Sequence, residues 1–283
     1  MIRRADGLAD LETWAAIKNV VQPAEPVTAG ELADDPEARF LLHGDAGCAV
    51  VKPSSLVGCA FTMVRVVPHA RRRGIGSALL GACSVEARAL GLKALYGRVE
   101  GEDDHSLRFV ERRGFVEIGR EVEQKRELGA ESEPAAPPGI VITELAPDHL
   151  PGAYAVAVDA VPDLALDAEL EAVPYERWLE KTRSRFLHVA LEDGVVVGFA
   201  TLCPLAATPD TLDHELTGVL RSHRRRGIAE ALKRTQIAWA ASAGYRTLVT
   251  YTQEGNEAMR ALNLKLGYRE RFASIAVRGQ ASG

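Results

Sequence analysis

The sequence lacks the features that mark several protein classes. Its four cysteines form no Cys-x-x-Cys pair and no cysteine–histidine cluster, so no metal site is expected. No apolar run reaches about 18 residues, and the first twenty residues lack the apolar core of a signal peptide. We therefore expect free, mostly buried thiols, no membrane association and a cytoplasmic location.

An excess of positive charge is also missing. The formal net charge of the 283 residues is −5, which argues against a nucleic-acid-binding protein, because such a protein usually has a basic surface. The hydrophobic share of 47% and the charged share of 26% are typical of a globular protein with a core. A cluster of arginines in this chain must therefore have a local role.

One such cluster occurs twice. The residues RRRGI stand at 71–75 and again at 224–228, and farther along Gly91 aligns with Gly244 at the same offset and without a gap. A match that keeps one register over this length indicates a tandem duplication of a whole domain.

The composition also indicates where the two copies join. Residues 129–139, GAESEPAAPPG, hold three prolines and no large apolar side chain, as is typical of a semi-rigid linker. We therefore expect one domain over 1–128 and a second over 140–283.

Both copies have the same predicted order of elements, which indicates a mixed α/β (α+β) fold class. In the first copy we expect strands at 39–44, 47–51, 58–66, 92–100 and 114–128, and helices at 75–89 and 103–113. In the second copy we expect strands at 185–194, 195–202, 211–220 and 245–252, and helices that begin at 228 and 256. The predicted core face of the first helix consists of Ile75, Ala78, Leu79, Ala82, Val85 and Ala89.

The duplicated arginines lie between a strand and a helix. A helix N-terminus exposes unpaired N–H groups and a partial positive charge, which together favour a phosphate. Gly74 and Gly227 have no Cβ, so an anion can approach the backbone there, and arginines add bidentate donors. An arginine-rich loop can also be a merely solvated surface, but its recurrence at the same junction favours binding. Neither a Walker A loop nor a dinucleotide fingerprint is present.

At these residues the sequence resembles the GNAT N-acetyltransferase superfamily. The pattern Arg-x-x-Gly-x-Gly/Ala looks like the acyl-CoA pyrophosphate loop of that family, and FVERRGF at 109–115 and LNLKLGY at 262–268 resemble a later motif. The resemblance covers nearly the whole chain. It implies two domains, each a mixed, mostly antiparallel sheet flanked by helices, with acetyl-CoA as cosubstrate. Its pantetheine arm would enter a gap between two strands, beside a bulge.

The resemblance also implies which residues contact the cosubstrate. Asp103 replaces Asn256 in the first copy, and a carboxylate is a poorer neighbour for a phosphate. The residues expected to bind acetyl-CoA are Val66, Arg71, Arg72, Arg73, Gly74, Gly76 and Ser77 in the first copy, and Thr217, Val219, Arg224, Arg225, Arg226, Gly227, Ala229 and Asn256 in the second.

The second copy has the better set of catalytic side chains. A lysine-like amine with a pKa near 10.4 is mostly protonated at pH 7, so a general base is needed. Glu215 has the same strand parity as Thr217 and Val219, and it resembles the family's general base, although a surface carboxylate is an equal alternative. Asn263 stands where many members place a tyrosine as general acid. The strand at 58–66 has neither a carboxylate nor a histidine, so the first domain is expected to be degenerate.

Two functions follow from this comparison. The first is an acetyl-CoA-dependent N-acetyltransferase, in which a primary amine attacks the thioester directly. The alternative is a non-catalytic acyl-CoA-binding or regulatory module with the same fold. The acceptor is expected to be a small-molecule or peptide amine, and the acidic segment 160–180 favours a cationic one.

Overall fold

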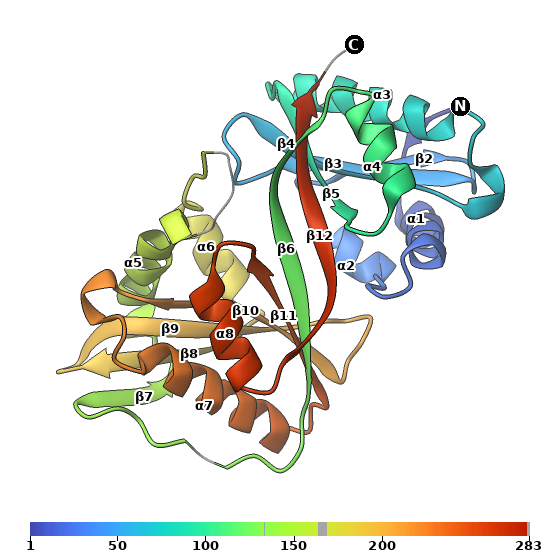
Figure 1. Ribbon diagram of the computed structural model, residues 1–283. Coiled ribbons are helices and arrows are strands. Elements are labelled where there is room, and N and C mark those ends of the chain that lie inside the picture. The colour runs from blue at the N-terminus through green and yellow to red at the C-terminus, as the bar shows by residue number, and fades with distance from the viewer. Residues whose placement is uncertain (133, 164–168, 282–283) are drawn as a thin grey trace. The chain divides into compact units, whose positions relative to one another are not determined.

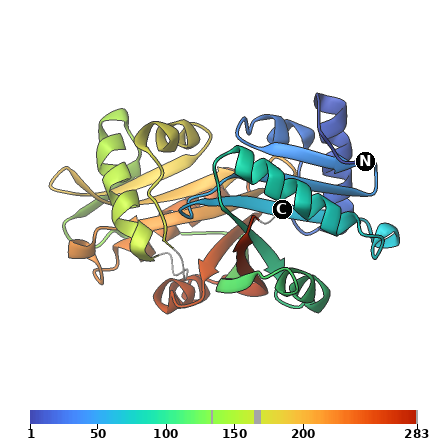
Figure 2. The ribbon, with the colours of Figure 1, turned by 90° about the horizontal axis from the view of Figure 1, so that it is seen from above.

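The computed structural model describes residues 1–132, 134–163 and 169–281 (Figure 1). They form two compact units, Met1–Gly119 with Ser274–Gly283, and Arg120–Ala273. Each unit is a mixed sheet with helices on both faces, which confirms the predicted fold class (Figure 2). No helix among the described residues is long and apolar enough to cross a membrane.

The N-terminal unit contains the first copy's strands. Strands β1 to β4 pair as antiparallel neighbours, β4 and β5 are parallel, and part of β12 lies antiparallel to β5. Helices α1 and α2 pack on one face, and α3 and α4 pack on the other. The elements are β1 (Arg3–Arg4), α1 (Leu8–Val21), α2 (Ala29–Ala33), β2 (Arg39–His43), β3 (Gly47–Pro53), β4 (Cys59–Val66), α3 (Ile75–Ala89), β5 (Ala94–Glu100), α4 (Asp104–Glu111) and β12 (Arg269–Gln280).

The C-terminal unit repeats this plan. Its strand order is β6-β11-β10-β9-β8-β7, and only β10 and β11 are parallel. Helices α5 and α6 pack on one face, and α7 and α8 pack on the other. The elements are β6 (Val116–Glu127), β7 (Ile140–Glu144), α5 (Leu150–Ala160), α6 (Tyr175–Thr182), β8 (Phe186–Glu192), β9 (Val195–Pro204), β10 (Thr211–Val219), α7 (Ile228–Ser242), β11 (Thr247–Gln253) and α8 (Glu257–Lys265).

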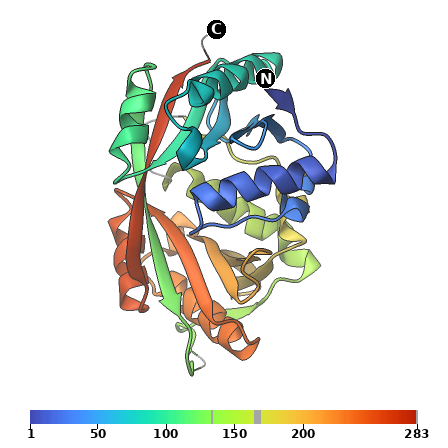
Figure 3. The same ribbon diagram turned by 90° about the vertical axis from the view of Figure 1, so that its right-hand side faces the viewer.

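The last strand of each copy is exchanged. Residues 121–127 of β6 pair with β11, and residues 274–280 of β12 pair with β5 (Figure 3). Each exchanged strand satisfies backbone donors and acceptors that β5 or β11 would otherwise expose at a sheet edge. The units therefore differ from the expected consecutive domains 1–128 and 140–283. The expected linker, where it is described, forms neither helix nor strand.

Local predictions agree with the structure except for one helix face. The buried residues of α3 include Leu79, Cys83 and Ala87. Three residues of the predicted face, Ala78, Val85 and Ala89, are exposed. The predicted face is confirmed for Leu79, which is buried, and for Ile75 and Ala82, which pack against the same core. It was wrong for the other three, because the row spaced by four residues decides the packing of α3 against β3. The thiols are free as expected, and Cys48, Cys59 and Cys83 are buried.

Candidate functional site

The RRRGI loop of the N-terminal unit leads directly into α3. Arg72 has φ 63° and Gly74 has φ 81°, so two left-handed residues turn the chain just before the helix. The first helical hydrogen bond runs from the N–H of Ala78 to the C=O of Gly74. The N–H groups of residues 75–77 therefore have no acceptor within the helix. A Cβ on Gly74 would meet nothing within 4 Å, so this helix start is open to an anion.

The C-terminal unit builds the same turn. Arg225 has φ 64° and Gly227 has φ 80°. In both units the first arginine of the triplet is fixed by the end of the preceding strand, because Arg71 Nε donates to Val66 O (3.1 Å) and Arg224 Nε donates to Val219 O (3.0 Å). The duplication thus conserves backbone geometry as well as sequence.

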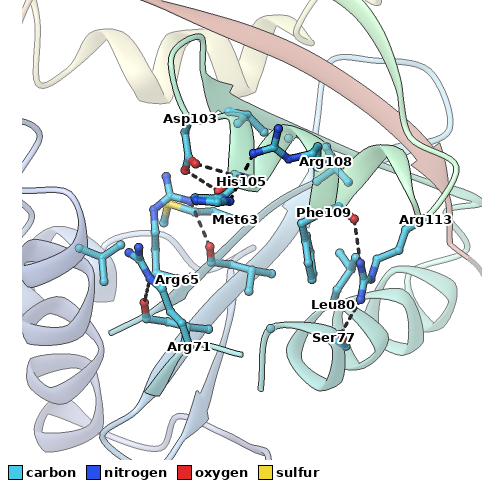
Figure 4. Close-up of a pocket in the computed structure, with 18 of the residues that line it drawn as sticks. Met63, Arg65, Arg71, Ser77, Leu80, Asp103, His105, Arg108, Phe109 and Arg113 are labelled. Carbon is cyan, nitrogen blue, oxygen red and sulfur yellow. Dashed lines mark hydrogen bonds between the residues drawn. The ribbon is translucent and has the colours of Figure 1, made fainter. Parts of the chain in front are cut away.

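A cavity of about 780 Å³ lies beside the helix start of the N-terminal unit (Figure 4). This volume is in the range of small-molecule sites. Residues of β4, β5, α3 and α4 line it. Arg73 is not part of the lining, but the other six predicted residues of this copy are: Val66, Arg71, Arg72, Gly74, Gly76 and Ser77.

The cavity opens where two strands separate. Strands β4 and β5 pair at Cys59, Ala60 and Phe61, and the pairing ends there. Farther along, residues 63–66 stay paired with β3 on one side and line the cavity on the other. This leaves a strand edge that an extended ligand segment can join.

The bulge implied by the family resemblance is present in only one unit. Strand β10 shifts register between His214 and Thr217, whereas the pairing of β4 with β3 is continuous from Ala60 to Val66. The gap beside β4 therefore arises from the divergence of β4 and β5 alone.

The open helix start has further cationic neighbours. Among the described residues, Arg72 and Arg73 take part in no ion pair. Arg113, just beyond α4, donates to Ser77 Oγ (2.6 Å) and to Phe109 O (2.8 Å), and its guanidinium lies 3.7 Å from the centre of the Phe109 ring. Positive charge thus surrounds this helix start, and Asp103 is a carboxylate whose pKa the charge of Arg71 helps to lower, although it forms no ion pair with the loop among the described residues.

In the C-terminal unit the corresponding arginines are neutralised. Both Nη atoms of Arg224 contact the Asp163 carboxylate, at 3.2 and 2.7 Å. Arg226 makes a two-pronged contact with Glu192, and the hydrogen bond from Arg226 is the largest cause that lowers the pKa of Glu192. A Cβ on Gly227 would lie 3.8 Å from Pro137 of the linker. Two of the three arginines of this loop therefore have carboxylate partners, whereas Arg225 and the first N–H groups of α7 keep their donors.

The expected catalytic residues of the C-terminal unit are also engaged. Both carboxylate oxygens of Glu215 accept hydrogen bonds from Arg185, one of them at 2.8 Å, and this raises the pKa of Arg185. Asn263 is fully buried, and its Nδ2 donates to Gln124 Oε1 (2.9 Å) and Thr252 Oγ1 (3.1 Å). Neither residue is held ready for proton transfer, and their catalytic roles stay predictions.

The remaining predicted contacts have structural partners. Asn256 caps α8 by accepting the N–H of Met259 (3.3 Å), and Asp103 caps α4 by accepting that of Ser106 (3.0 Å). Thr217 and Val219 are each only 9% exposed, and Ala229 packs against the core. Helix capping by itself therefore accounts for both side chains, and their contact with a cosubstrate stays a prediction.

Sequence reasoning missed one group of cavity residues. Glu100 at the end of β5, Asp103 and His105 line the cavity together with Arg65 and Gln22. The alternation of Tyr96, Arg98 and Glu100 along a strand was the available signal, because it places three polar side chains on one face. These residues lie on the strand that follows the arginine loop and its helix, whereas the predicted base lies on the strand before the loop.

Comparisons with known proteins agree with this architecture. The model of the acetyltransferase (GNAT) family matches residues 11–115 and 152–268, once in each copy. A GCN5-related N-acetyltransferase from Sphaerobacter thermophilus is 20% identical with a TM-score of 0.81, and the match covers 100% of this chain and 96% of that chain. A tandem GNAT protein from the clavulanic acid biosynthesis pathway is 20% identical with a TM-score of 0.79, over 100% and 99% of the two chains.

At these identities the structural likeness supports the fold and nothing more. No protein with a curated function matches the sequence. The family model, however, matches most of the chain in two separate regions. The chain therefore belongs to the GNAT acetyltransferase family, as a member that carries two copies of the domain in tandem.

Proposed function

We propose that the protein is an acetyl-CoA-dependent N-acetyltransferase whose acetyl-CoA site lies in the N-terminal unit. One observation carries this proposal: the 780 Å³ cavity joins an open helix N-terminus to the unpaired edge of β4. A diphosphate and an extended amide-containing arm need these two features side by side. The proposal therefore assigns the cosubstrate to the copy that the sequence alone made the weaker candidate.

The residues present fit acetyl-CoA. The N–H groups of residues 75–77, with Arg71 and Arg72, would hold the diphosphate, and Ser77 adds a hydroxyl. The backbone of Val64 and Val66 would pair with the amides of the pantetheine arm. The thioester would then lie near the point where β4 and β5 separate.

The reaction needs a proton acceptor near that point. The amine nitrogen forms a bond to the thioester carbonyl carbon, the C–S bond breaks, and coenzyme A leaves as a thiolate. Glu100 would take the amine proton, directly or through a water, because it lines the cavity and has no ion-pair partner among the described residues. Glu215, held by Arg185, remains the corresponding prediction for the C-terminal unit.

The test compares two conservative variants in the full-length chain. Thiol release from acetyl-CoA is followed with a broad panel of primary amines for the parent, Glu100→Gln and Glu215→Gln. We expect Glu100→Gln to lower kcat by about 100-fold or more with acetyl-CoA affinity retained, and Glu215→Gln to behave like the parent. The opposite pattern would place the reaction in the C-terminal unit.

A specific observation also supports a non-catalytic role for one unit. The ion pairs of Arg224 and Arg226 leave Arg225 as the one arginine of the C-terminal triplet without a carboxylate partner among the described residues, as in a domain that keeps the fold with a weakened anion site. If acetyl-CoA binds to the full chain and no amine of the panel releases thiol, the whole protein is an acyl-CoA-binding module.

A further inference from the structure

The cavity of the N-terminal unit contains a largely buried cation. Arg65 of β4 lines this cavity together with Gln22, which follows α1, and Figure 4 draws Arg65 close to Met63. Burial lowers the pKa of the Arg65 guanidinium, which shows that its charge is poorly solvated. A guanidinium in such a place usually pairs with an anion.

Arg65 lies on the face opposite the expected diphosphate site. Along β4, Val64 packs against the core that contains α3, Phe61 and Met63 pack against the core that contains α1, and Val66, at the end of the strand, contacts both. Arg65 has the parity of Phe61 and Met63, so it points to the α1 side. The diphosphate site belongs to α3, so this charge is placed for a second ligand.

The hydrogen bonds of Arg65 are incomplete. A guanidinium has five N–H donors. Nε and Nη2 donate to Gln22 Oε1 at 3.3 and 2.8 Å, and Nη1 donates to the C=O of Val64 at 3.1 Å. Two donors therefore have no acceptor among the described residues, and no carboxylate of those residues is within ion-pair distance of Arg65. The charges of Glu25, Glu100 and Asp103 act against the lowering of the Arg65 pKa without forming an ion pair with it, and Gln22 Nε2 donates to Glu25.

A second buried cation lies close to Arg65. Lys18 of α1 is 3% exposed, burial lowers its pKa, and repulsion from Arg65 lowers it further. The neighbouring Cys48 does not compensate this charge, because burial raises the pKa of its thiol to about 12 and keeps it neutral. Lys18 is not among the residues that line the cavity, and the charge of Glu25 offsets part of its own, so of these two cations Arg65 alone faces the cavity.

The opposite charge that an amine needs is on the same face. Tyr96 and Phe61 have their rings 5.8 Å apart, so the alternate residues Arg98 and Glu100 of β5 share the face of Arg65. On the α1 side of the sheet the cavity is thus lined by two arginines, Arg65 and Arg98, and by the carboxylate of Glu100. A ligand that matches this pattern carries an amine and an acid group in one small molecule.

We infer that the acceptor is an amine that also bears an anionic group, a carboxylate or a phosphate, which Arg65 binds while the amine faces Glu100. This inference rests on the proposed function of the same cavity. It replaces the expectation of a cationic acceptor from segment 160–180, which belongs to the other unit and of which 164–168 lie outside the described residues.

The experiment uses matched acceptors with the full-length protein and acetyl-CoA. Glycine is compared with glycinamide, β-alanine with β-alaninamide, and O-phosphoethanolamine with ethanolamine, by thiol release. The parent should prefer the acid-bearing member of at least one pair by about 10- to 100-fold in kcat/KM. At a given pH a larger fraction of the amine is unprotonated in an amino amide than in the corresponding amino acid. A preference for the amino acids therefore cannot come from a larger supply of neutral amine. The phosphate pair shows which anion is recognised.

Arg65→Gln tests the residue itself. In this variant we expect the kcat/KM of the acid-bearing acceptor, divided by that of its neutral counterpart, to fall toward one, mainly because KM for the acid-bearing acceptor rises. Arg65→Lys should restore part of this preference. Arg234→Gln, the same change at an exposed ion pair on α7, should keep the parent ratio. A parent without preference, or an Arg65→Gln variant that keeps it, would overturn the inference.

Binding decides the question if no amine of the panel reacts. N-acetylated glycine and β-alanine are titrated against the parent with coenzyme A present, next to the corresponding N-acetylated amides, and calorimetry gives each affinity. Tighter binding of the acids that is lost in Arg65→Gln would support the anion site even in a protein without transferase activity. Equal binding of acids and amides would contradict it. If acceptors without an acid group react as fast as the acid-bearing ones, in the parent and in Arg65→Gln alike, the transferase proposal stands and the inferred anion site at Arg65 is wrong.

Discussion

Arg224 and Asp163 form a two-pronged ion pair, with Nη1 3.2 Å from Oδ1 and Nη2 2.7 Å from Oδ2. The pair lies at the helix start of the C-terminal unit. With the contact between Arg226 and Glu192, it gives two of the loop's three arginines a carboxylate partner. The same loop in the N-terminal unit has no such carboxylates among the described residues, and there the cavity is found.

This difference predicts the stoichiometry of acetyl-CoA binding. Calorimetry on the parent chain should give one site. The double variant Asp163→Asn/Glu192→Gln, which releases both arginines, should show a second, weaker site because free guanidinium groups again face the helix start. Two equal sites in the parent would show that the ligand displaces these carboxylates easily.

The helix start of α3 predicts the effect of a single glycine. Gly74→Glu would place a carboxylate where the diphosphate is expected, and acetyl-CoA affinity should fall by at least about tenfold. Gly91→Glu is the matched control, because Gly91 also has a left-handed φ, 76°, and open space around it, but follows the other end of α3. Equal losses of affinity in the two variants would indicate backbone strain instead of a diphosphate site.

The exchanged strand predicts that the C-terminal end of the chain stabilises the N-terminal unit. A Cβ on Gly279 would come within 2.6 Å of the Phe115 ring. Gly279→Ala should therefore lower the free energy of unfolding by about 1–3 kcal/mol, as overpacking does. Chemical denaturation of the full chain, followed together with acetyl-CoA binding, measures this effect.

The control for that variant is Gly81→Ala in α3, where a Cβ would meet nothing within 4 Å. Alanine there should stabilise the helix by up to about 1 kcal/mol. If Gly279→Ala is as harmless as Gly81→Ala, the strand pairing between β12 and β5 is looser than the structure indicates.

Buried Lys233 predicts a pH dependence of stability. Burial lowers the pKa of this α7 lysine to about 7. Between about pH 7 and 10 the unfolded chain therefore binds more protons at this side chain than the folded chain does, so its contribution makes stability rise with pH. Lys233→Met removes the penalty and should raise the free energy of unfolding on the order of 3 kcal/mol at pH 7, with a gain that shrinks toward pH 10.

Urea unfolding at pH 7, 8.5 and 10 measures this gain. Lys265→Met, at an exposed α8 lysine, is the control and should shift stability little at any of these pH values. A gain for Lys233→Met that stays constant with pH would come from packing and not from the titration of the lysine. Asp213, whose pKa burial raises to about 7, has the opposite pH dependence, because between about pH 4 and 7 the folded chain binds more protons at this carboxyl than the unfolded chain does.

Much of the fold was readable from local pattern. The repeated RRRGI, the alternating apolar strands and the glycines after each helix predict two copies of one domain, because they depend on spacing and backbone conformation within a few residues. The left-handed φ of Gly74 and Gly227 confirms the same turn in both copies. The family membership follows from these local features as well.

Only the tertiary structure decided which arginine loop is paired with carboxylates. Asp163, Glu192 and Pro137 are far from Arg224–Gly227 in sequence, and folding alone brings them to that loop. The exchange of β6 and β12 likewise depends on which sheet edge is unpaired. Sequence fixes what each segment can form by itself, whereas charge neutralisation and cavity shape are sums over side chains from distant segments, and no local pattern contains them.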